Sequence, residues 1–259
     1  MSPRLEQRRR VAVLDPVLRS REHVRRAVRA LGHTPLVFNS MEELLLLRGA
    51  PLRCSAMCLG SPPDTTDLRV WVRNARSMVA ADVPLLFLTR DNLLKDIEAL
   101  SCVEGDQILA APTSFADVYN ALEAFLAEHE LPTAGRGLEW DGFRFMPSLE
   151  SVMVDGTEIW LKPLEFELAL EFFHNVDRVL SRDWLRGMAS GVAPSASGRW
   201  LDASVGRLRS QLGLASLHGC EWKLSNVSHA GFKLSKDHGK KGARASAVPE
   251  RHLLQHQPE

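Results

Sequence analysis

The first 127 residues alternate short apolar runs with amphipathic segments. The apolar runs have the length of buried strands and lie at 11–15, 34–38, 55–59, 84–89 and 107–111. After the first run, apolar residues recur at helical spacing up to Gly32, at Val24, Ala27, Val28 and Leu31. Helical patterns follow the other runs at 41–47, 67–79, 91–101 and 115–126. Five strands that each precede a helix predict an α/β doubly wound domain, with a parallel sheet of five strands covered on both faces.

The pattern changes after a polar stretch. Residues 128–138 contain prolines and glycines without periodicity, as is typical of a linker between a first domain over 11–127 and a second over 139–236. In the second domain apolar and polar residues alternate on either side of Asp155-Gly156, which predicts a hairpin with a type I′ turn. Further elements are expected as helices at 163–174, 181–188 and 199–213 and as a closing hairpin at 222–234. This order predicts an α+β winged helix-turn-helix domain.

The two ends of the chain differ from both domains. Residues 1–10 are rich in arginine, and we expect them to form a basic arm. Residues 237–259 are polar and contain proline and glycine, and we expect them to be a disordered tail.

The helix expected at 199–213 has two stripes of different character. Its core stripe falls within about 60° on a helical wheel and consists of Leu201, Val205, Leu208 and Leu212. A second stripe, roughly 100° away, consists of Trp200, Ser204, Arg207 and Gln211. Arg209 lies on the other flank. Serine, arginine and glutamine can bind base edges or phosphates in a major groove, but an ordinary surface helix with solvated arginines has the same pattern.

Composition changes this picture through its distribution along the chain. The 259 residues are 45% hydrophobic with a formal net charge of zero, which indicates a globular protein rather than a disordered one. By segment, residues 1–50 have a net charge of +5, residues 101–170 of −10 and residues 178–259 of +7. The basic end favours a polyanion as partner, although solvated charged faces would give the same counts.

Cysteine use and hydropathy bear on the cell compartment. The four cysteines include no CxxC pair, no apolar run is long enough to span a membrane, and the N-terminus has no secretory pattern. We therefore expect a reduced, cytoplasmic protein without a membrane partner.

Three strings in the second domain carry a family resemblance. They read LKPLEFELALEFFHNVDRVLSRDWL, RWLDASVGRLRSQLG and LSNVSHAGFKLS, and in order and spacing they resemble the effector domain of OmpR/PhoB-type response regulators. The resemblance implies double-stranded DNA as partner. It implies contacts to DNA by Arg199, Ser204, Arg207, Arg209, Asn226 and Ser228, to which the helical wheel adds Gln211. The chain departs from the usual family residues at Ser204, Ser228 and His229-Ala230-Gly231.

The first domain then resembles a receiver domain with a degenerate phosphorylation pocket. An aspartyl phosphate needs a carboxylate nucleophile, acidic residues that hold Mg²⁺, and a lysine that balances the charge. The resemblance assigns the acidic pair to Asp15 and Pro16, and the nucleophile to Leu59, or to Cys58 if the register shifts by one. It assigns the switch residue to Thr89 and the lysine to Ala111. It also implies a cis bond between Ala111 and Pro112. We expect no metal, no cofactor and no conventional phosphorylation.

Together these patterns predict a DNA-binding transcriptional regulator. An enzyme is not expected, since the chain has neither a glycine-rich phosphate loop nor a catalytic motif. The receiver-like domain would dimerise or sense a signal, through a face drawn from 91–101 and 115–126. A homodimer on DNA half-sites is expected, and RNA polymerase or an adaptor is a further candidate partner.

Three alternatives stay open. The first is an adaptor protein whose receiver-like domain docks a partner. The second is a DNA-binding regulator switched by unusual phosphorylation at Asp64 or by a small ligand in the altered pocket. The third is redox sensing by Cys54 and Cys58.

Overall fold

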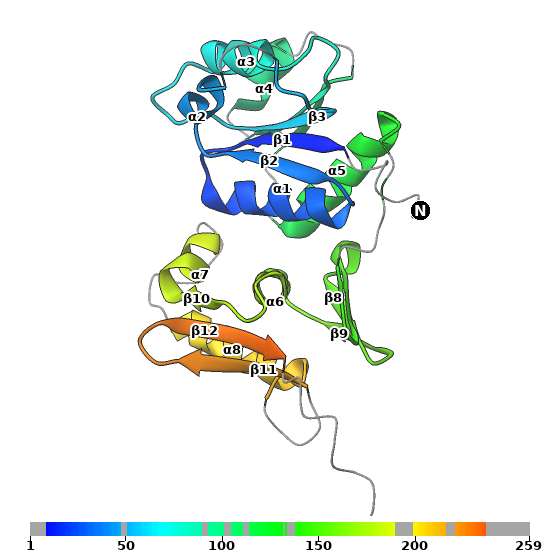
Figure 1. Cartoon of the computed structure of the whole chain (residues 1–259), viewed down its shortest axis with the longest axis vertical. Coiled ribbons are helices and arrows are strands. Elements are labelled where there is room, and N and C mark those ends of the chain that lie inside the picture. Colours follow the sequence, from blue (N-terminus) through cyan, green and yellow to red (C-terminus); the bar gives the residue numbers. More distant parts are fainter. Residues whose placement is uncertain are drawn as a thin grey trace, which may run out of the picture.

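In the computed structural model of the chain, two domains follow one another along the long axis (Figure 1). The described residues are 9–47, 51–89, 93–100, 105–110, 114–131, 133, 138–189, 199–215 and 221–236. Most of the predicted basic arm, the predicted tail and the Ala111–Pro112 bond lie outside these ranges. Within them, no helix combines the length and the apolar character that crossing a bilayer requires.

A five-stranded parallel sheet forms the centre of the first domain, with strand order β2-β1-β3-β4-β5. Its strands are β1 (Arg10–Leu14), β2 (Thr34–Phe38), β3 (Ala56–Gly60), β4 (Leu85–Thr89) and β5 (Gln107–Ala110). Helices α1 (Leu18–Ala30) and α5 (Phe115–Glu128) cover one face. The other face packs against α2 (Met41–Leu45), α3 (Leu68–Ser77) and α4 (Leu94–Leu100) (Figure 1). The doubly wound fold that the apolar pattern predicts is confirmed.

Side-chain caps determine where the helices of this domain begin. Ser40, Asp67 and Ser114 accept hydrogen bonds from the backbone N–H groups three residues further on, at the starts of α2, α3 and α5. At Ser114 the bond is reciprocated by Asp117, which completes a capping box. Helix α5 continues to Glu128, one residue into the segment predicted as a linker.

The second domain begins with an antiparallel sheet of order β6-β7-β8-β9. The elements are β6 (Glu139–Trp140), β7 (Phe143–Met146), the short helix η2 (Pro147–Leu149), β8 (Ser151–Val154) and β9 (Thr157–Trp160). Between β8 and β9, Asp155 and Gly156 have φ angles of 47° and 85°, as the predicted type I′ turn requires. The hairpin signal in the sequence is therefore confirmed.

Three helices and a second sheet complete this domain. They are α6 (Pro163–His174), β10 (Val179–Ser181), α7 (Arg182–Met188), α8 (Arg199–Gln211), β11 (Trp222–Val227) and β12 (Gly231–Lys236), with sheet order β10-β12-β11. The predicted N-cap Ser181 accepts from the Trp184 N–H at 3.1 Å. Gly231 has φ +144°, and a Cβ there would lie 2.0 Å from the Leu180 carbonyl oxygen, so only glycine lets β12 approach β10. This is the predicted winged-helix arrangement.

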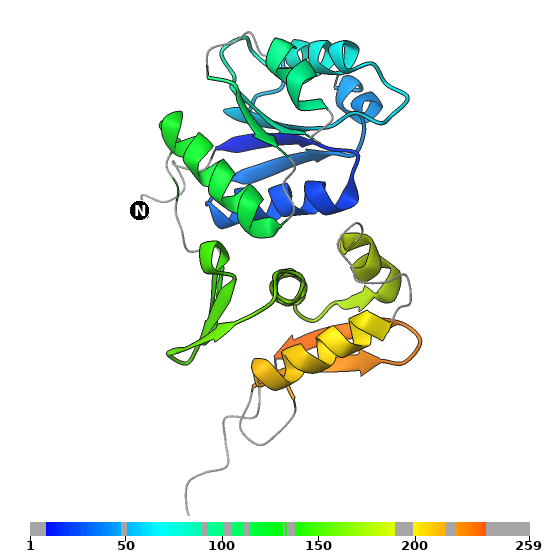
Figure 2. The same cartoon turned by 180° about the vertical axis from the view of Figure 1, so that it is seen from behind.

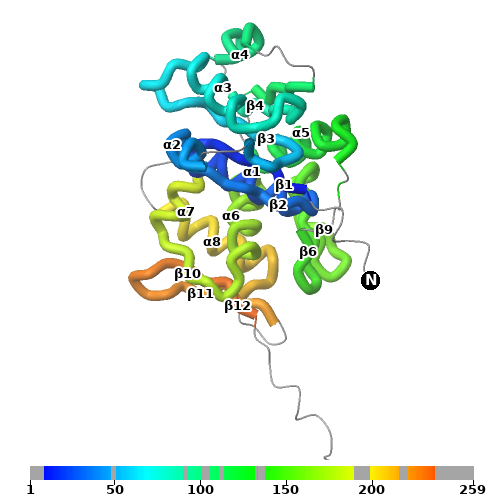
Figure 3. The backbone as a smooth tube through the Cα atoms, turned by 45° about the horizontal axis from the view of Figure 1, so that its top comes forward, coloured from blue at the N-terminus to red at the C-terminus, as the bar shows by residue number. Residues whose placement is uncertain are grey.

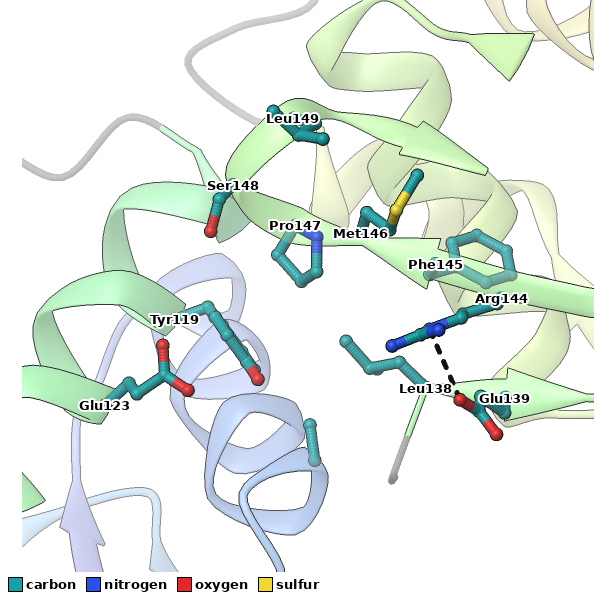
Figure 4. Close-up of a pocket in the computed structure, with 11 residues that line it drawn as sticks. Tyr119, Glu123, Leu138, Glu139, Arg144, Phe145, Met146, Pro147, Ser148 and Leu149 are labelled. Carbon is teal, nitrogen blue, oxygen red and sulfur yellow. Dashed lines mark ion pairs between the residues drawn. The ribbon is translucent and has the colours of Figure 1, made fainter. Parts of the chain in front are cut away.

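The two domains share an interface that the sequence did not predict. Helices α1 and α5 face η2, α6 and α7 (Figures 2 and 3). One apolar core of buried side chains runs through both domains. A pocket of about 290 Å³ lies where α5 meets β7 and η2. Tyr119 and Pro147 line it, and Arg144 pairs with Glu139 at 3.3 Å in its wall (Figure 4).

Charged side chains are buried at the centre of this interface. Arg26 of α1 is 0% exposed and forms an ion pair with Glu171 of α6, which is 1% exposed. Nearby, Glu167 of α6 pairs with Arg19 at 2.5 Å and accepts from the Phe115 N–H at the start of α5 at 3.1 Å. The face of α1 that its pattern marks as polar is therefore covered by the second domain.

Candidate nucleic-acid interface

Helix α8 and the β11–β12 hairpin form the side of the second domain turned away from the first. In Figures 1 and 2, α6 lies between α8 and the receiver-like domain. The predicted core stripe Leu201, Val205, Leu208 and Leu212 is buried. The opposite side of α8 is left open to solvent, as a helix that enters a groove requires.

One predicted DNA contact is corrected by the structure. Ser204 is 3% exposed, and its hydroxyl accepts a hydrogen bond from Arg207 Nη2 at 3.0 Å. The stripe of Ser204 lies only about 100° from the core stripe, and α6 packs against that flank of the helix. The exposed face is instead centred on Arg199, Ala203, Gly206 and Ser210, with Arg207 and Gln211 at its edge. On the helical wheel, these residues lie opposite the core stripe, so selecting the side of the helix opposite the core would have identified them.

The three arginines of α8 differ in how they are held. Arg207 is 48% exposed and pairs with the buried carboxylate of Glu165 on α6. Arg209 donates from Nε to the Leu224 carbonyl at 2.6 Å. Arg199, at the start of the helix, is exposed and has no ion-pair partner among the described residues. Arg207 and Arg209 thus have fixed guanidinium planes, whereas Arg199 is unconstrained by a counter-charge.

An acidic residue beside Arg199 is neutralised from the preceding helix. Arg182 of α7 donates two hydrogen bonds to the carboxylate oxygens of Asp202, at 3.0 and 2.7 Å. These hydrogen bonds hold the pKa of Asp202 below its ordinary value. The paired Asp202 therefore opposes a phosphate much less than a free carboxylate would.

The hairpin presents its predicted residues to solvent. Asn226 and Ser228 are exposed, as are His229 at the tip and Lys223 on β11. His229 has φ 57°, in the left-handed region, as a tight turn requires. Lys223 has no ion-pair partner among the described residues, whereas Lys233 pairs with Asp177 at 3.3 Å. An exposed basic helix face beside an exposed polar hairpin suits a duplex.

In the predicted receiver pocket, the residue of β3 that faces Asp15 differs from the one that the sequence assigns. Leu59 is 1% exposed and lies in the apolar core beneath α2 and α3, so its assignment to the pocket is wrong. Strand β3 runs one residue further, and Gly60 lies against Asp15: a Cβ on Gly60 would be 2.3 Å from Asp15 Cγ. Because side chains alternate along a strand, this shift of one residue decides which one points into the pocket.

The remaining pocket positions hold no acidic cluster. Asp15 is buried, and its Oδ1 accepts from the Val17 N–H at 2.8 Å, which makes it a cap of the turn before α1. Thr89 is buried at the end of β4, Asp64 is exposed beyond β3, and Ala111 lies outside the described residues. In the described part of the chain, no three His, Cys, Asp or Glu side chains gather as metal ligands do.

Two relatives place the chain in a family. It is 31% identical over 150 residues to the transcriptional regulatory protein QseB of Haemophilus influenzae, an alignment that covers 56% of the chain and 67% of QseB. The chain belongs to the OmpR/PhoB family of response regulators. PhoB, the phosphate regulon transcriptional regulatory protein of Pseudomonas aeruginosa, is 25% identical over 155 residues, covering 58% of the chain and 66% of PhoB. Both relatives are transcription factors, which agrees with the expectation of no enzyme.

No protein-family model matches the chain. Solved structures of OmpR/PhoB regulators resemble it at low scores. DrrB of Thermotoga maritima is 17% identical with a TM-score of 0.37, covering 88% of the chain and 99% of DrrB. The RstA DNA-binding domain of Klebsiella pneumoniae, solved with the RstA box, is 21% identical with a TM-score of 0.32 and covers 38% of the chain and 94% of the domain. The fold assignment therefore stands on the strand order and helix arrangement described above.

Proposed function

We propose that this OmpR/PhoB-family chain binds double-stranded DNA through α8 and the β11–β12 hairpin and regulates transcription. The observation that carries the proposal is the exposed face of α8: Arg199 has no ion-pair partner among the described residues, and Arg207, about two turns further along the helix, is held in position by Glu165. Arg209, Gln211, Asn226 and Ser228 extend this surface toward the hairpin. A helix in the major groove and a hairpin on the backbone would use these residues together.

Salt-dependent DNA binding tests this proposal. The full chain is titrated with a fragment of its own promoter and with unrelated DNA of equal length, at increasing salt. We expect preference for the promoter and an affinity that falls steeply with salt, because phosphate contacts release counterions. Arg199→Ala should weaken binding by about 1–3 kcal/mol. The matched control is Arg73→Ala on α3, an exposed arginine in the other domain, which should leave binding unchanged. No preference for the promoter at low salt would contradict the proposal.

We further propose that the receiver-like domain works without aspartyl phosphorylation. The support is Gly60, which lies where its Cβ would meet the Asp15 carboxylate, so the carboxyl end of β3 offers no nucleophile at this point. Asp15 itself is committed to the turn before α1. Incubation with acetyl phosphate and Mg²⁺ followed by intact-protein mass spectrometry should show no adduct. A stoichiometric adduct that disappears in Asp64→Asn would establish the alternative of phosphorylation at Asp64.

Two further parts of the proposal concern assembly and location. We propose a cytoplasmic homodimer that occupies two half-sites, since an OmpR/PhoB module of this size gains affinity from a second copy. Helix α4 offers exposed charges for such pairing at Lys95, Asp96 and Glu98. Light scattering of the chain with and without promoter DNA should show two chains per duplex. A contact to RNA polymerase or an adaptor would be sought by crosslinking on the same complex.

A further inference from the structure

A groove of about 750 Å³ lies between the two domains. Helix α1 forms one wall, and the other comes from β6, the end of α6 with the loop after it, α7 and β11. Small-molecule sites typically have volumes of about 300–1,000 Å³ and often lie at domain interfaces. The groove is separate from the receiver pocket at Asp15 and from the exposed face of α8, so neither proposed role explains it.

Positive charge exceeds negative charge on the walls of the groove, whose lining includes three arginines and the carboxylate of Glu22. Arg25 and Arg29 come from α1, and Arg178 comes from the loop after α6. Arg25 pairs with Glu22 at 2.5 Å, but neither Arg29 nor Arg178 has an ion-pair partner among the described residues. Partial burial, and then repulsion from Arg25, lower the pKa of Arg29. Guanidinium groups in this arrangement favour an anion, above all a planar carboxylate or a phosphate.

Flat aromatic side chains line the same groove. Three of the six tryptophans of the chain are here: Trp140, Trp184 and Trp222. Trp184 donates its indole N–H to Glu171 at 2.9 Å, whereas the buried Trp222 indole N–H has no hydrogen-bond partner among the described residues. Because the Trp222 nitrogen is itself buried, the groove offers a planar ligand ring mainly the half-buried side chains of Trp140 and Trp184 to pack against.

The floor of the groove is tied to the ion pair between the domains. Glu171, which pairs with Arg26 of α1, also accepts hydrogen bonds from Trp184 and from Asn175 Nδ2, each at 2.9 Å. Trp184 and Asn175 both line the groove. The positions of its walls therefore depend on how the two domains are docked.

We propose that this groove binds a small anion that carries a planar ring, namely an aromatic or heteroaromatic carboxylate or phosphate. The arginines hold the anionic group and the tryptophans hold the ring. Because the two walls belong to different domains, the ligand binds the docked arrangement better than an undocked one and stabilises it. We also expect DNA affinity to depend on whether the domains are docked, and this step alone rests on the proposed function.

Calorimetric titration of the full chain without DNA tests the site. The ligands are indole-3-acetate for the carboxylate, adenosine monophosphate for the phosphate, and tryptophol as a ring without charge. For at least one anion we expect one saturable site with a Kd below about 1 mM. Tryptophol should bind at least tenfold more weakly. Arg29→Met and Arg178→Met should each weaken the anion at least tenfold, whereas the control Arg73→Met should not.

Each result of the titration has a defined meaning. The anion that binds more tightly shows whether the groove prefers an indole carboxylate or an adenine phosphate. No saturable binding by either anion, equal binding of tryptophol, or no effect of the arginine substitutions would overturn the site. Failure of DNA binding would leave these results intact, because no DNA is present. Where both bind, the anion should change DNA affinity roughly fivefold or more; an unchanged affinity would overturn the coupling.

Discussion

The buried ion pair between Arg26 and Glu171 should make a large contribution to holding the domains together. In Glu171→Gln the side chain can still accept from Trp184 and Asn175, so the change removes mainly the negative charge. Burial lowers the pKa of Arg26 to about 9, so this guanidinium is still charged at neutral pH. Among the described residues, its counter-charges would then be Glu22, at 3.8 Å, and Glu167, whose charge also acts on this guanidinium.

The magnitude follows from the burial of both groups. Removing one partner of a buried pair costs about 3–5 kcal/mol, because the other charge is left uncompensated. Glu22 remains, so we expect the lower end, about 3 kcal/mol, or a fall of roughly 6–12 °C in Tm for a chain of this size. Replacing both partners, in Arg26→Met/Glu171→Gln, should recover more than half of the loss, since no charge is then buried without its partner.

Urea unfolding followed by tryptophan fluorescence and circular dichroism measures these changes. The exposed pair Arg144–Glu139 provides the control, because Arg144→Met should cost no more than about 1 kcal/mol. Small-angle X-ray scattering reports whether Glu171→Gln also separates the domains before they unfold. A stabilising role of the buried pair is refuted if Glu171→Gln is as stable as Arg144→Met, or if the double variant is no more stable than Arg26→Met alone.

Three further predictions follow from buried groups. Burial lowers the pKa of His23 below its ordinary 6.5, and it lowers the pKa of His174 to about 3. The unfolded chain therefore binds protons more readily, so the free energy of unfolding should fall as the pH decreases below 6.5. The fall should reach at most about 1.4 kcal/mol per pH unit for each histidine. Urea unfolding of His23→Gln/His174→Gln should show a flatter slope with pH, and an unchanged slope would contradict this. Gly60→Ala should cost about 1–3 kcal/mol by thermal unfolding, and adding Asp15→Ala should relieve the clash; two additive losses would contradict the contact. Burial raises the pKa of Cys58 to about 12, so a maleimide should label Cys58 only on unfolding, as peptide mapping by mass spectrometry can show. Rapid labelling of Cys58 in the folded chain would restore the redox alternative.

Elements with a self-contained pattern could be predicted from the sequence. The stripe of Val24, Ala27, Val28 and Leu31 identifies the buried face of α1, because those residues pack on the sheet of their own domain. Asp155-Gly156 likewise identifies a turn, since its backbone angles depend on two adjacent residues.

Features that depend on a second element could not be predicted in this way. Arg26 has the pattern of a solvated helix face and is buried only because α6 covers it. Ser204 is buried for the same reason, by its position on the flank of α8 that meets α6. At the receiver pocket, an error of one residue in the end of β3 exchanged Gly60 for Leu59, because adjacent strand residues point to opposite faces.

The most direct test of the account is a DNA titration with and without acetyl phosphate and Mg²⁺. The full chain is titrated against its own promoter fragment and against unrelated DNA of the same length. We predict tighter binding to the promoter fragment, with the same affinity whether or not acetyl phosphate is present. Equal affinity for both DNAs, or an affinity for the promoter that changes with acetyl phosphate, would contradict a DNA-binding regulator whose receiver-like domain works without phosphorylation.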